Sequence, residues 1–204
     1  RPLNVKHYDL SGAHTRMSVE NSLKKLNTDY IDVLLLHRPS PLMDPSVIAS
    51  EIQKLQKEGK VKQLGVSNFT SSQMQLIQKE VLLSWNQIEC SLTHEISMFD
   101  GTLDFMKFKD IGAMAWNPLG IYFKEDSIQQ QRVQEVIIPL CKKYNCSEDQ
   151  LLLAWLIHHP SKIFPVVGTT SAARMKKALE ATELELDITD WFLLLEASMG
   201  KPLP

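Results

Sequence analysis

The sequence is poor in the features that mark several specialised classes of protein. It has 3 cysteines in 204 residues, no block of like charge, and no apolar run near the ~20 residues that cross a membrane. Lysine and arginine total 22 against 24 for aspartate and glutamate, which gives a net charge of -2. We therefore expect no nucleic-acid partner, no membrane partner and no disulfide scaffold.

The three cysteines also lack the spacing of a metal site. Cys141 and Cys146 are too far apart along the chain for a C-x-x-C motif, and Cys90 stands well away from both. We expect reduced thiols in a cytoplasmic protein, and no metal site.

What the chain does have is the ordinary material of a globular core. Hydrophobic residues make up 44% of it and charged residues 23%. A chain of this length buries a sizeable core without disulfides. We predict a single domain over residues 1–204.

Short apolar runs alternate with amphipathic stretches along the whole chain. The runs have the length of strands, and their continuous apolar character is typical of strands covered on both faces. This alternation indicates parallel βα units, so the predicted fold class is α/β. The predicted strands are 31–36, 61–66, 86–91, 112–117 and 163–168. The predicted helices are 18–26, 46–60 with its stop at Gly59, 71–81, 103–110, 127–145 with a break at Pro139 left open, 147–159, 172–182, and a terminal helix from Asp190.

Two architectures fit this pattern. One is an open, doubly wound sheet, and the other is part of a (β/α)8 barrel. Composition and periodicity do not separate them. The sequence contains neither GxGxxG nor GxxxxGK[ST], so the glycine-rich turn of a doubly wound nucleotide-binding fold is missing.

Polar side chains gather where the predicted strands end. The carboxyl ends of parallel strands share one edge of a sheet, which is where such folds place their active sites. Each residue alone has a structural explanation, such as a helix cap or a core contact, but five equivalent positions are harder to explain in this way. The residues are His37 and Arg38; Ser67 and Asn68; Asn86, Gln87 and Glu89; Trp116 and Asn117; and Gly168, Thr169, Thr170 and Arg174.

Several of these segments carry a resemblance. YIDVLLLHRPSP, GKVKQLGVSNFT, NQIECSLTH, AMAWNPLG and PVVGTTSAARMKKAL occur in the order seen in the aldo-keto reductase family. The HRPSPLMDP and FDGTLDFMKF segments resemble its bacterial-type oxidoreductases. The resemblance implies a (β/α)8 TIM barrel, of which this chain carries strands 4–8. It also implies NADPH-dependent reduction of aldehydes or ketones to alcohols, with a small carbonyl compound as substrate.

The resemblance also implies roles for individual residues. His37 matches the catalytic histidine that orients the substrate carbonyl. Ser67, Asn68 and Gln87 match the residues that hold the nicotinamide carboxamide, and amide, hydroxyl and carboxamide side chains supply the donors and acceptors that it needs. The remaining predicted cofactor residues are Trp116, stacked on the nicotinamide; Asn117, Leu119 and Gly120, under the pyrophosphate; and Gly168, Thr169, Thr170 and Arg174, at the adenosine 2'-phosphate, which favours NADPH.

The chain departs from the family pattern in two places. It lacks segments resembling DxADxYG and SKCG, which carry the family's catalytic aspartate, tyrosine and lysine, and its four tyrosines stand in other contexts. We therefore expect the chain to be the C-terminal two-thirds of a longer reductase. The turn LGIYFKED is also about two residues shorter than the related turn. A non-catalytic NADPH-binding module or a truncated, inactive relative is the alternative, and a doubly wound phosphate-binding protein is a weaker one.

Overall fold

The computed structural model describes residues 5 and 7–203 and contains two compact units. The first unit comprises the residues through Gln87 together with Phe105–Ile111. The second comprises Ile88–Asp104 together with the residues from Gly112 onward. The single domain expected from the sequence stays a prediction.

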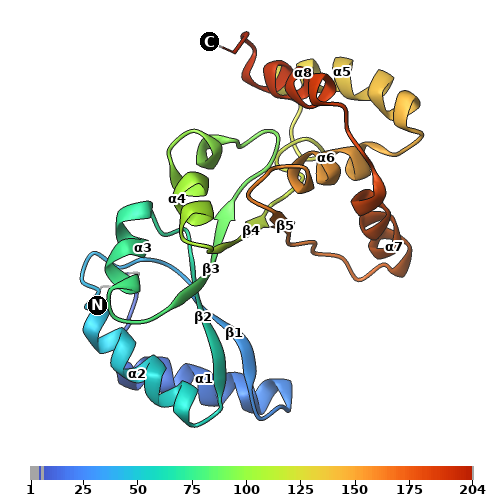
Figure 1. The fold of residues 1–204 in the computed structure, drawn as a ribbon. Helices are drawn as coiled ribbons and strands as arrows, with labels where there is room; N and C mark the ends of the chain where they lie inside the picture. Colours follow the sequence, from blue (N-terminus) through green and yellow to red (C-terminus); the bar gives the residue numbers. More distant parts are fainter. Residues whose placement is uncertain (1–4, 6, 204) are drawn as a thin grey trace. The chain divides into compact units, whose positions relative to one another are not determined.

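The first unit is built from βα repeats (Figure 1). Its elements are α1 (Gly12–Leu26), β1 (Ile31–Leu36), α2 (Pro45–Lys57), β2 (Val61–Ser67), α3 (Ser71–Gln78) and β3 (Leu83–Glu89), the last two residues of which fall in the second unit. β2 pairs in parallel with both β1 and β3. The predicted strand 31–36 is confirmed, and Gly59, the predicted stop of α2, has a φ of 73°.

Local capping explains where the helices of this unit begin. The Asp44 carboxylate accepts hydrogen bonds from the backbone of Ser46 and Val47, and Thr70 forms a capping box with Gln73. The prediction for α1 was six residues too short. Ser11 caps this helix, seven residues before the predicted start at residue 18. The buried position nearest its start is Thr15, which is not apolar and so gives no hydrophobic pattern in the sequence.

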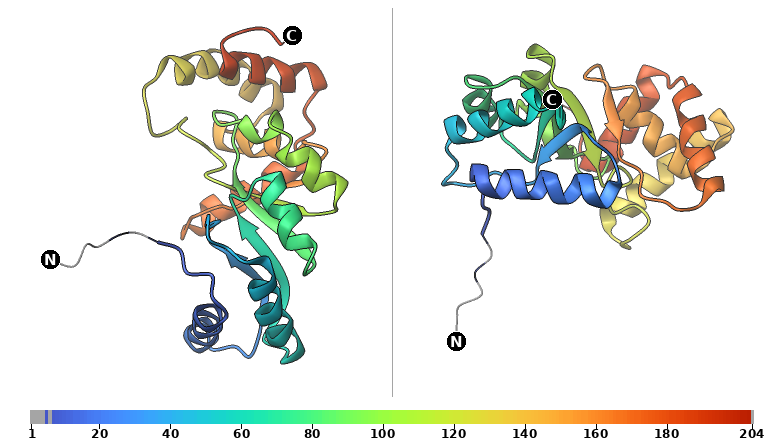
Figure 2. Two further views of the ribbon diagram at one scale, coloured as in Figure 1. Left: turned by 90° about the vertical axis from the view of Figure 1, so that its left-hand side faces the viewer. Right: turned by 90° about the horizontal axis from the view of Figure 1, so that it is seen from below.

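The core of the first unit lies between its helices and one face of the sheet. Val19 and Leu23 of α1 and Leu55 of α2 cluster with Val61 of β2, and the half-buried Ile31 and Leu34 of β1 pack against them. α1 and α2 contact each other, and both lie beside these strands (Figure 1 and Figure 2). β1 itself is only partly buried, with Leu36 as its one buried residue, so burial on both faces was wrong for this strand.

The second unit carries the remaining elements. They are η1 (Ile96–Met98), α4 (Thr102–Phe108, whose residues from Phe105 belong to the first unit), β4 (Gly112–Trp116), α5 (Ile128–Tyr144), α6 (Glu148–Ile157), β5 (Ile163–Pro165), α7 (Ala172–Glu180), η2 (Ala181–Glu183) and α8 (Ile188–Met199). β4 and β5 pair in parallel. The described residues thus contain five strands in an α/β arrangement, as expected.

Several predicted boundaries are wrong for local reasons. β3 begins three residues early, at Leu83, and ends at Glu89 because Ser91 and His94 exchange backbone hydrogen bonds and turn the chain. β5 ends at Pro165, not at residue 168, and its pairing with β4 ends there, apart from one bond from the Val166 amide to the Ala115 carbonyl.

α5 runs through Pro139 without ending there. Proline removes one helical hydrogen bond and usually kinks or breaks a helix. Buried residues stand on both sides of it, at Val133, Ile137 and Leu140, so tertiary packing holds the helix across the proline.

Two tryptophans join α6 to α8 by a reciprocal contact. The Trp155 indole donates to the Trp191 carbonyl over 3.0 Å, and the Trp191 indole donates to the Trp155 carbonyl over 2.8 Å. The rings stack with centroids 4.7 Å apart and planes inclined by 7°. Trp155 is fully buried, so its donor and ring are both held away from water.

The substitution Trp155→Phe should lower the free energy of unfolding by about 1–3 kcal/mol, because it leaves the Trp191 carbonyl without its indole donor. Trp85→Phe is the matched control, since the Trp85 indole donates to the exposed Gln63 side chain over 2.7 Å. Its cost should stay below about 1 kcal/mol. Urea unfolding followed by circular dichroism measures both, and equal losses would contradict the role of the paired indoles.

The substitution Gly65→Ala should destabilise the first unit by about 1–3 kcal/mol through overpacking. A Cβ at Gly65 would overlap the Leu35 side chain and lie 3.0 Å from the Trp85 Cβ. Gly12→Ala makes the same chemical change in α1, where the nearest atom is 3.5 Å away, and should be neutral or stabilising. Thermal melts measure the stability of the two variants. An unchanged melting temperature for Gly65→Ala would contradict the prediction, because it would show that the strands move apart at little cost in free energy.

Candidate functional site

The predicted residues of the first unit form a row at the carboxyl ends of three neighbouring strands. The parallel register pairs Leu36 of β1 with Val66 of β2, so His37 follows at the level of Ser67. Ser67 in turn is the register partner of Gln87 on β3. Since neighbouring strands lie about 4.8 Å apart, the backbone at these three positions spans about 10 Å.

Hydrogen bonds fix the middle of this row. The Ser67 hydroxyl donates to the Gln87 carbonyl over 3.1 Å and accepts from the Asn68 amide group over 3.0 Å. The Asn68 backbone N–H donates to the same carbonyl over 2.9 Å. Ser67 is 3% exposed, and its hydroxyl already serves as both donor and acceptor. Its role is therefore to position Asn68, and direct contact with a ligand is left to its neighbours.

Asn68 ends β2 in a left-handed conformation, with a φ of 57°. Asparagine tolerates this region better than most residues, which explains its place directly after a buried strand. The turn leaves Asn68 half-buried at the edge of the sheet. Gln87 is also half-buried, and His37 is exposed, so these three side chains can be reached from solvent.

Asn86, which the sequence places beside Gln87, does not join this row. It is fully buried, and its amide group donates to the Phe69 carbonyl over 3.0 Å and contacts the Met74 sulfur at 3.3 Å. Its side-chain oxygen has no partner in the part of the chain that the structure describes. Asn86 therefore ties the start of the α3 region to β3.

In the second unit, the turn after β4 contains Trp116, Asn117, Leu119 and Gly120. Trp116 is half-buried at the end of the strand. Asn117 is left-handed, with a φ of 54°, and its amide group donates to the Glu89 carboxylate over 3.2 Å. The turn therefore presents an amide side chain that is held in place by a carboxylate.

Gly120 is required by the space around it as well as by its φ of 56°. A Cβ there would overlap the Thr93 hydroxyl and lie 2.6 Å from the Ser91 hydroxyl. The same Thr93 hydroxyl accepts from the Ile121 backbone N–H over 3.1 Å. The turn is thus closed by hydroxyl groups, whereas Leu119 is half-buried on it.

Lys124, which no sequence pattern singles out, also lies at this turn. Its ammonium donates to the Asn117 side-chain oxygen over 2.5 Å. The sequence shows only that a lysine stands a few residues beyond AWNPLG. Its contact with Asn117 depends on how the turn folds, which the sequence does not reveal. The Lys124 ammonium places a positive charge at this turn, which suits an anionic ligand.

The segment after β5 holds the last predicted residues. Gly168, Thr170 and Arg174 are exposed and Thr169 is half-buried. The Thr169 hydroxyl accepts from the Ser171 N–H over 3.1 Å, and the Ser171 hydroxyl caps α7 by accepting from the Arg174 N–H over 3.4 Å. A capped helix start with an arginine in its first turn can hold a phosphate group.

The structure thus groups the predicted residues by unit. His37, Ser67, Asn68 and Gln87 belong to the first unit, and the turn after β4 and the start of α7 belong to the second.

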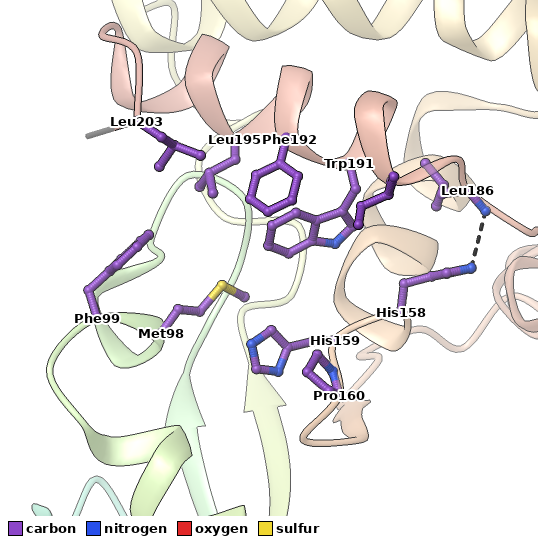
Figure 3. Close-up of a pocket in the computed structure, with 11 residues that line it drawn as sticks. Met98, Phe99, His158, His159, Pro160, Leu186, Trp191, Phe192, Leu195 and Leu203 are labelled. Carbon is purple, nitrogen blue, oxygen red and sulfur yellow. Dashed lines mark hydrogen bonds between the residues drawn. The ribbon is translucent and has the colours of Figure 1, made fainter.

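A cavity of about 480 Å³ in the second unit lies elsewhere (Figure 3). Its lining is apolar and aromatic, with Phe99, Trp191, Phe192 and Leu195 around it. His158 lies at its rim, where its Nε2 accepts from the Leu186 N–H over 3.1 Å. None of the predicted site residues is among those that line it, and its apolar character does not suit a charged cofactor.

The described residues include neither a candidate membrane span nor a cluster suited to a metal ion. No helix in them is both long and apolar enough to span a membrane. No group of three or more histidine, cysteine, aspartate or glutamate side chains in the same residues is placed to hold a metal ion.

Comparison with known proteins identifies the family. The pattern described as "Aldo/keto reductase family" matches residues 3–197. Uncharacterized oxidoreductase YcsN of Bacillus subtilis (strain 168) is 39% identical over 203 residues, which are 97% of this chain and 68% of that protein. The 6-dehydroglucose reductase of Agrobacterium fabrum is 36% identical over 202 residues, 97% of this chain and 67% of that protein.

A solved structure agrees at the level of the fold. The thermostable aldo-keto reductase Tm1743, in complex with the inhibitor epalrestat, superposes with a TM-score of 0.84 at 23% identity, over 92% of this chain and 67% of that one. The fold is therefore TIM-barrel-like. Taken with the family match over nearly its whole length, this shows that the chain belongs to the aldo/keto reductase family of oxidoreductases.

Proposed function

We propose that the protein binds NADPH and reduces aldehydes or ketones to alcohols. The observation that carries this proposal is the row of His37, Ser67 and Gln87 at the ends of three parallel strands in register. Polar side chains at that edge, ordered around the buried and hydrogen-bonded Ser67, are typical of a site for a polar ligand.

The nicotinamide end of the cofactor fits the first unit's row. Its carboxamide has a carbonyl and an NH₂ group, and the side chains of Asn68 and Gln87 can pair with both. Ser67 holds Asn68 for this purpose through the 3.0 Å bond between them. We assign stacking on the nicotinamide ring to Trp116, whose flat face limits which side of the ring is presented.

His37 is proposed to bind the substrate carbonyl oxygen. When bound, NADPH supplies the hydride that the carbonyl carbon accepts. A donor hydrogen bond from His37 to the oxygen stabilises the negative charge that develops there, and it fixes the orientation of the carbonyl. His37 lies beyond the buried Leu36 and is exposed, so a small substrate can reach it.

The phosphate groups of the cofactor fit the second unit's residues. We propose that Asn117, Leu119 and Gly120 form the turn under the pyrophosphate, with the Lys124 ammonium contributing a positive charge. Gly168, Thr169, Thr170 and Arg174 are proposed for the 2'-phosphate at the capped start of α7. The capping bonds at Ser171 and the exposure of Arg174 support this assignment.

The finer identity of the protein is also a proposal. The name of the Agrobacterium relative, a 6-dehydroglucose reductase, supports a small carbonyl substrate. The correspondence of the five strands to strands 4–8 of an eight-stranded barrel, and a cytoplasmic location, stay predictions.

One observation favours a second function, a non-catalytic NADPH-binding module. Reduction needs a proton donor, and two of the tyrosines are poor ones. Burial raises the pKa of Tyr122, and burial followed by the bond to Asp190 raises that of Tyr144, which donates to that carboxylate over 2.5 Å. NADPH fluorescence followed by a panel of aldehydes separates the two functions, because a module binds the cofactor without oxidising it.

His37→Ala should lower turnover of an aldehyde by about 100-fold or more, while the Kd for NADPH changes less than about threefold. The reason is that His37 is assigned to the substrate oxygen and not to the cofactor. His14→Ala is the control, because His14 is an exposed histidine of α1 to which no role in the site is assigned. Steady-state kinetics and fluorescence titration measure these effects, and undiminished turnover would refute the role.

Arg174→Ala should raise the Kd for NADPH by about 10–100-fold, which corresponds to the loss of a charge-assisted hydrogen bond. Binding of NADH, which has no 2'-phosphate, should be unchanged and serves as the internal control. An equal loss for both cofactors would place Arg174 outside the 2'-phosphate site.

A further inference from the structure

Cys141 and Cys146 meet at the C-terminal end of α5. The helix ends with Asn145 in the left-handed conformation, with a φ of 50°. The Cys146 N–H then donates to the Cys141 carbonyl over 3.0 Å. This six-to-one bond is that of a Schellman motif, in which the side chains of the two bonded residues normally contact each other.

The backbone bond sets an upper limit on the separation of the two cysteines. With standard bond lengths, a 3.0 Å contact between the Cys141 oxygen and the Cys146 nitrogen places the two Cα atoms no more than about 7 Å apart. Natural disulfides join Cα atoms about 4.4–6.8 Å apart. The separation of the two Cα atoms is therefore compatible with a disulfide between these residues.

The surroundings of the two thiols leave them reachable but protonated. Both are half-buried, whereas Cys90 is 0% exposed. Burial first, and then the neighbouring Cys146, raises the pKa of the Cys141 thiol to about 12, and burial also raises the pKa of Cys146. Because the thiolate is the attacking species, oxidation should be slow at neutral pH and should quicken in alkaline solution.

We propose that Cys141 and Cys146 are a modification site that forms a reversible intramolecular disulfide by exchange with a low-molecular-weight disulfide such as oxidised glutathione. One cysteine thiolate attacks a glutathione sulfur, which breaks the glutathione disulfide and releases one glutathione thiolate. The second cysteine thiolate attacks the mixed disulfide, forms the internal bond and releases the second glutathione. The two cysteines lose two electrons and two protons, and the glutathione disulfide gains both.

The site is next to a turn that the proposed function uses. Tyr122 follows Gly120, is 3% exposed, and its hydroxyl makes no hydrogen bond of normal geometry with the rest of the described chain. Its pKa is raised by burial, then by the Glu148 carboxylate and, last, by Cys141. Oxidation of Cys141 therefore changes the electrostatic surroundings of this buried tyrosine.

The test is to incubate the folded protein with oxidised glutathione at pH 8.5, quench it with acid, and count free thiols by alkylation and mass spectrometry. We expect the protein to lose two of its three thiols and two hydrogen atoms without retaining glutathione. Peptide mapping should join Cys141 to Cys146. Between pH 7 and 9 the rate should rise about tenfold per pH unit.

Three variants serve as controls. Cys90→Ala should behave as the parent protein does, since Cys90 is fully buried and takes no part. Cys146→Ser and Cys141→Ser should each retain one glutathione, because the second exchange step is lost. A parent protein that only accumulates glutathione adducts, or that keeps all three thiols at pH 8.5, would overturn the proposal. Peptide mapping of the disulfide is carried out on the parent protein. The test therefore remains decisive even if one of the variants fails to fold.

Discussion

The parallel register of β1, β2 and β3 is the constraint on which the proposed site depends. Backbone hydrogen bonds pair Leu36 with Val66 and Ser67 with Gln87, and this pairing alone brings residues 20 to 50 positions apart to one level. A shift of one residue would turn the core side chains to the opposite face, so the hydrophobic packing of α1 and α2 also protects the register. The core and the functional edge are therefore specified by the same interactions.

The second unit positions its polar residues by a different means. Its turn after β4 depends on Asn117 and Gly120, both with positive φ, and on hydroxyl groups that close around the glycine. The segment before α7 has little cover, and no residue of α7 is buried. One part of the proposed cofactor site is thus built on paired strands, whereas the other is built on turns and a helix start, which are easier to displace.

Much of the fold could be predicted because its signals are local. The apolar run 31–36 and the stop at Gly59 were read directly from the sequence, and both are confirmed. The start of α1 was missed because Thr15 fills a core position without being apolar, and the end of β3 was missed because a turn at Ser91 depends on a backbone contact with His94. These contacts form only after the chain folds, so no local pattern reports them.

In the site, too, local signals could be predicted from the sequence, whereas contacts that depend on the folded chain could not. Residue types after each strand predicted the row of His37, Ser67 and Gln87, because parallel strands share an edge. The contact between Lys124 and Asn117 and the inward turn of Asn86 could not be predicted, since both depend on side-chain direction within a folded turn or strand. Residue types at the strand ends indicate candidate positions, and the structure distinguishes Ser67 and Asn86, which support their neighbours, from side chains left open to solvent.

The shared level of the strand ends has a consequence for how such a protein can diversify. Chain added to the connection after β1, such as the segment containing Pro39 and Pro41, extends away from the sheet and leaves the hydrogen-bonded ladder as it is. New substrate preferences can therefore arise by lengthening or recomposing these connections while the residues proposed to bind the cofactor stay in place.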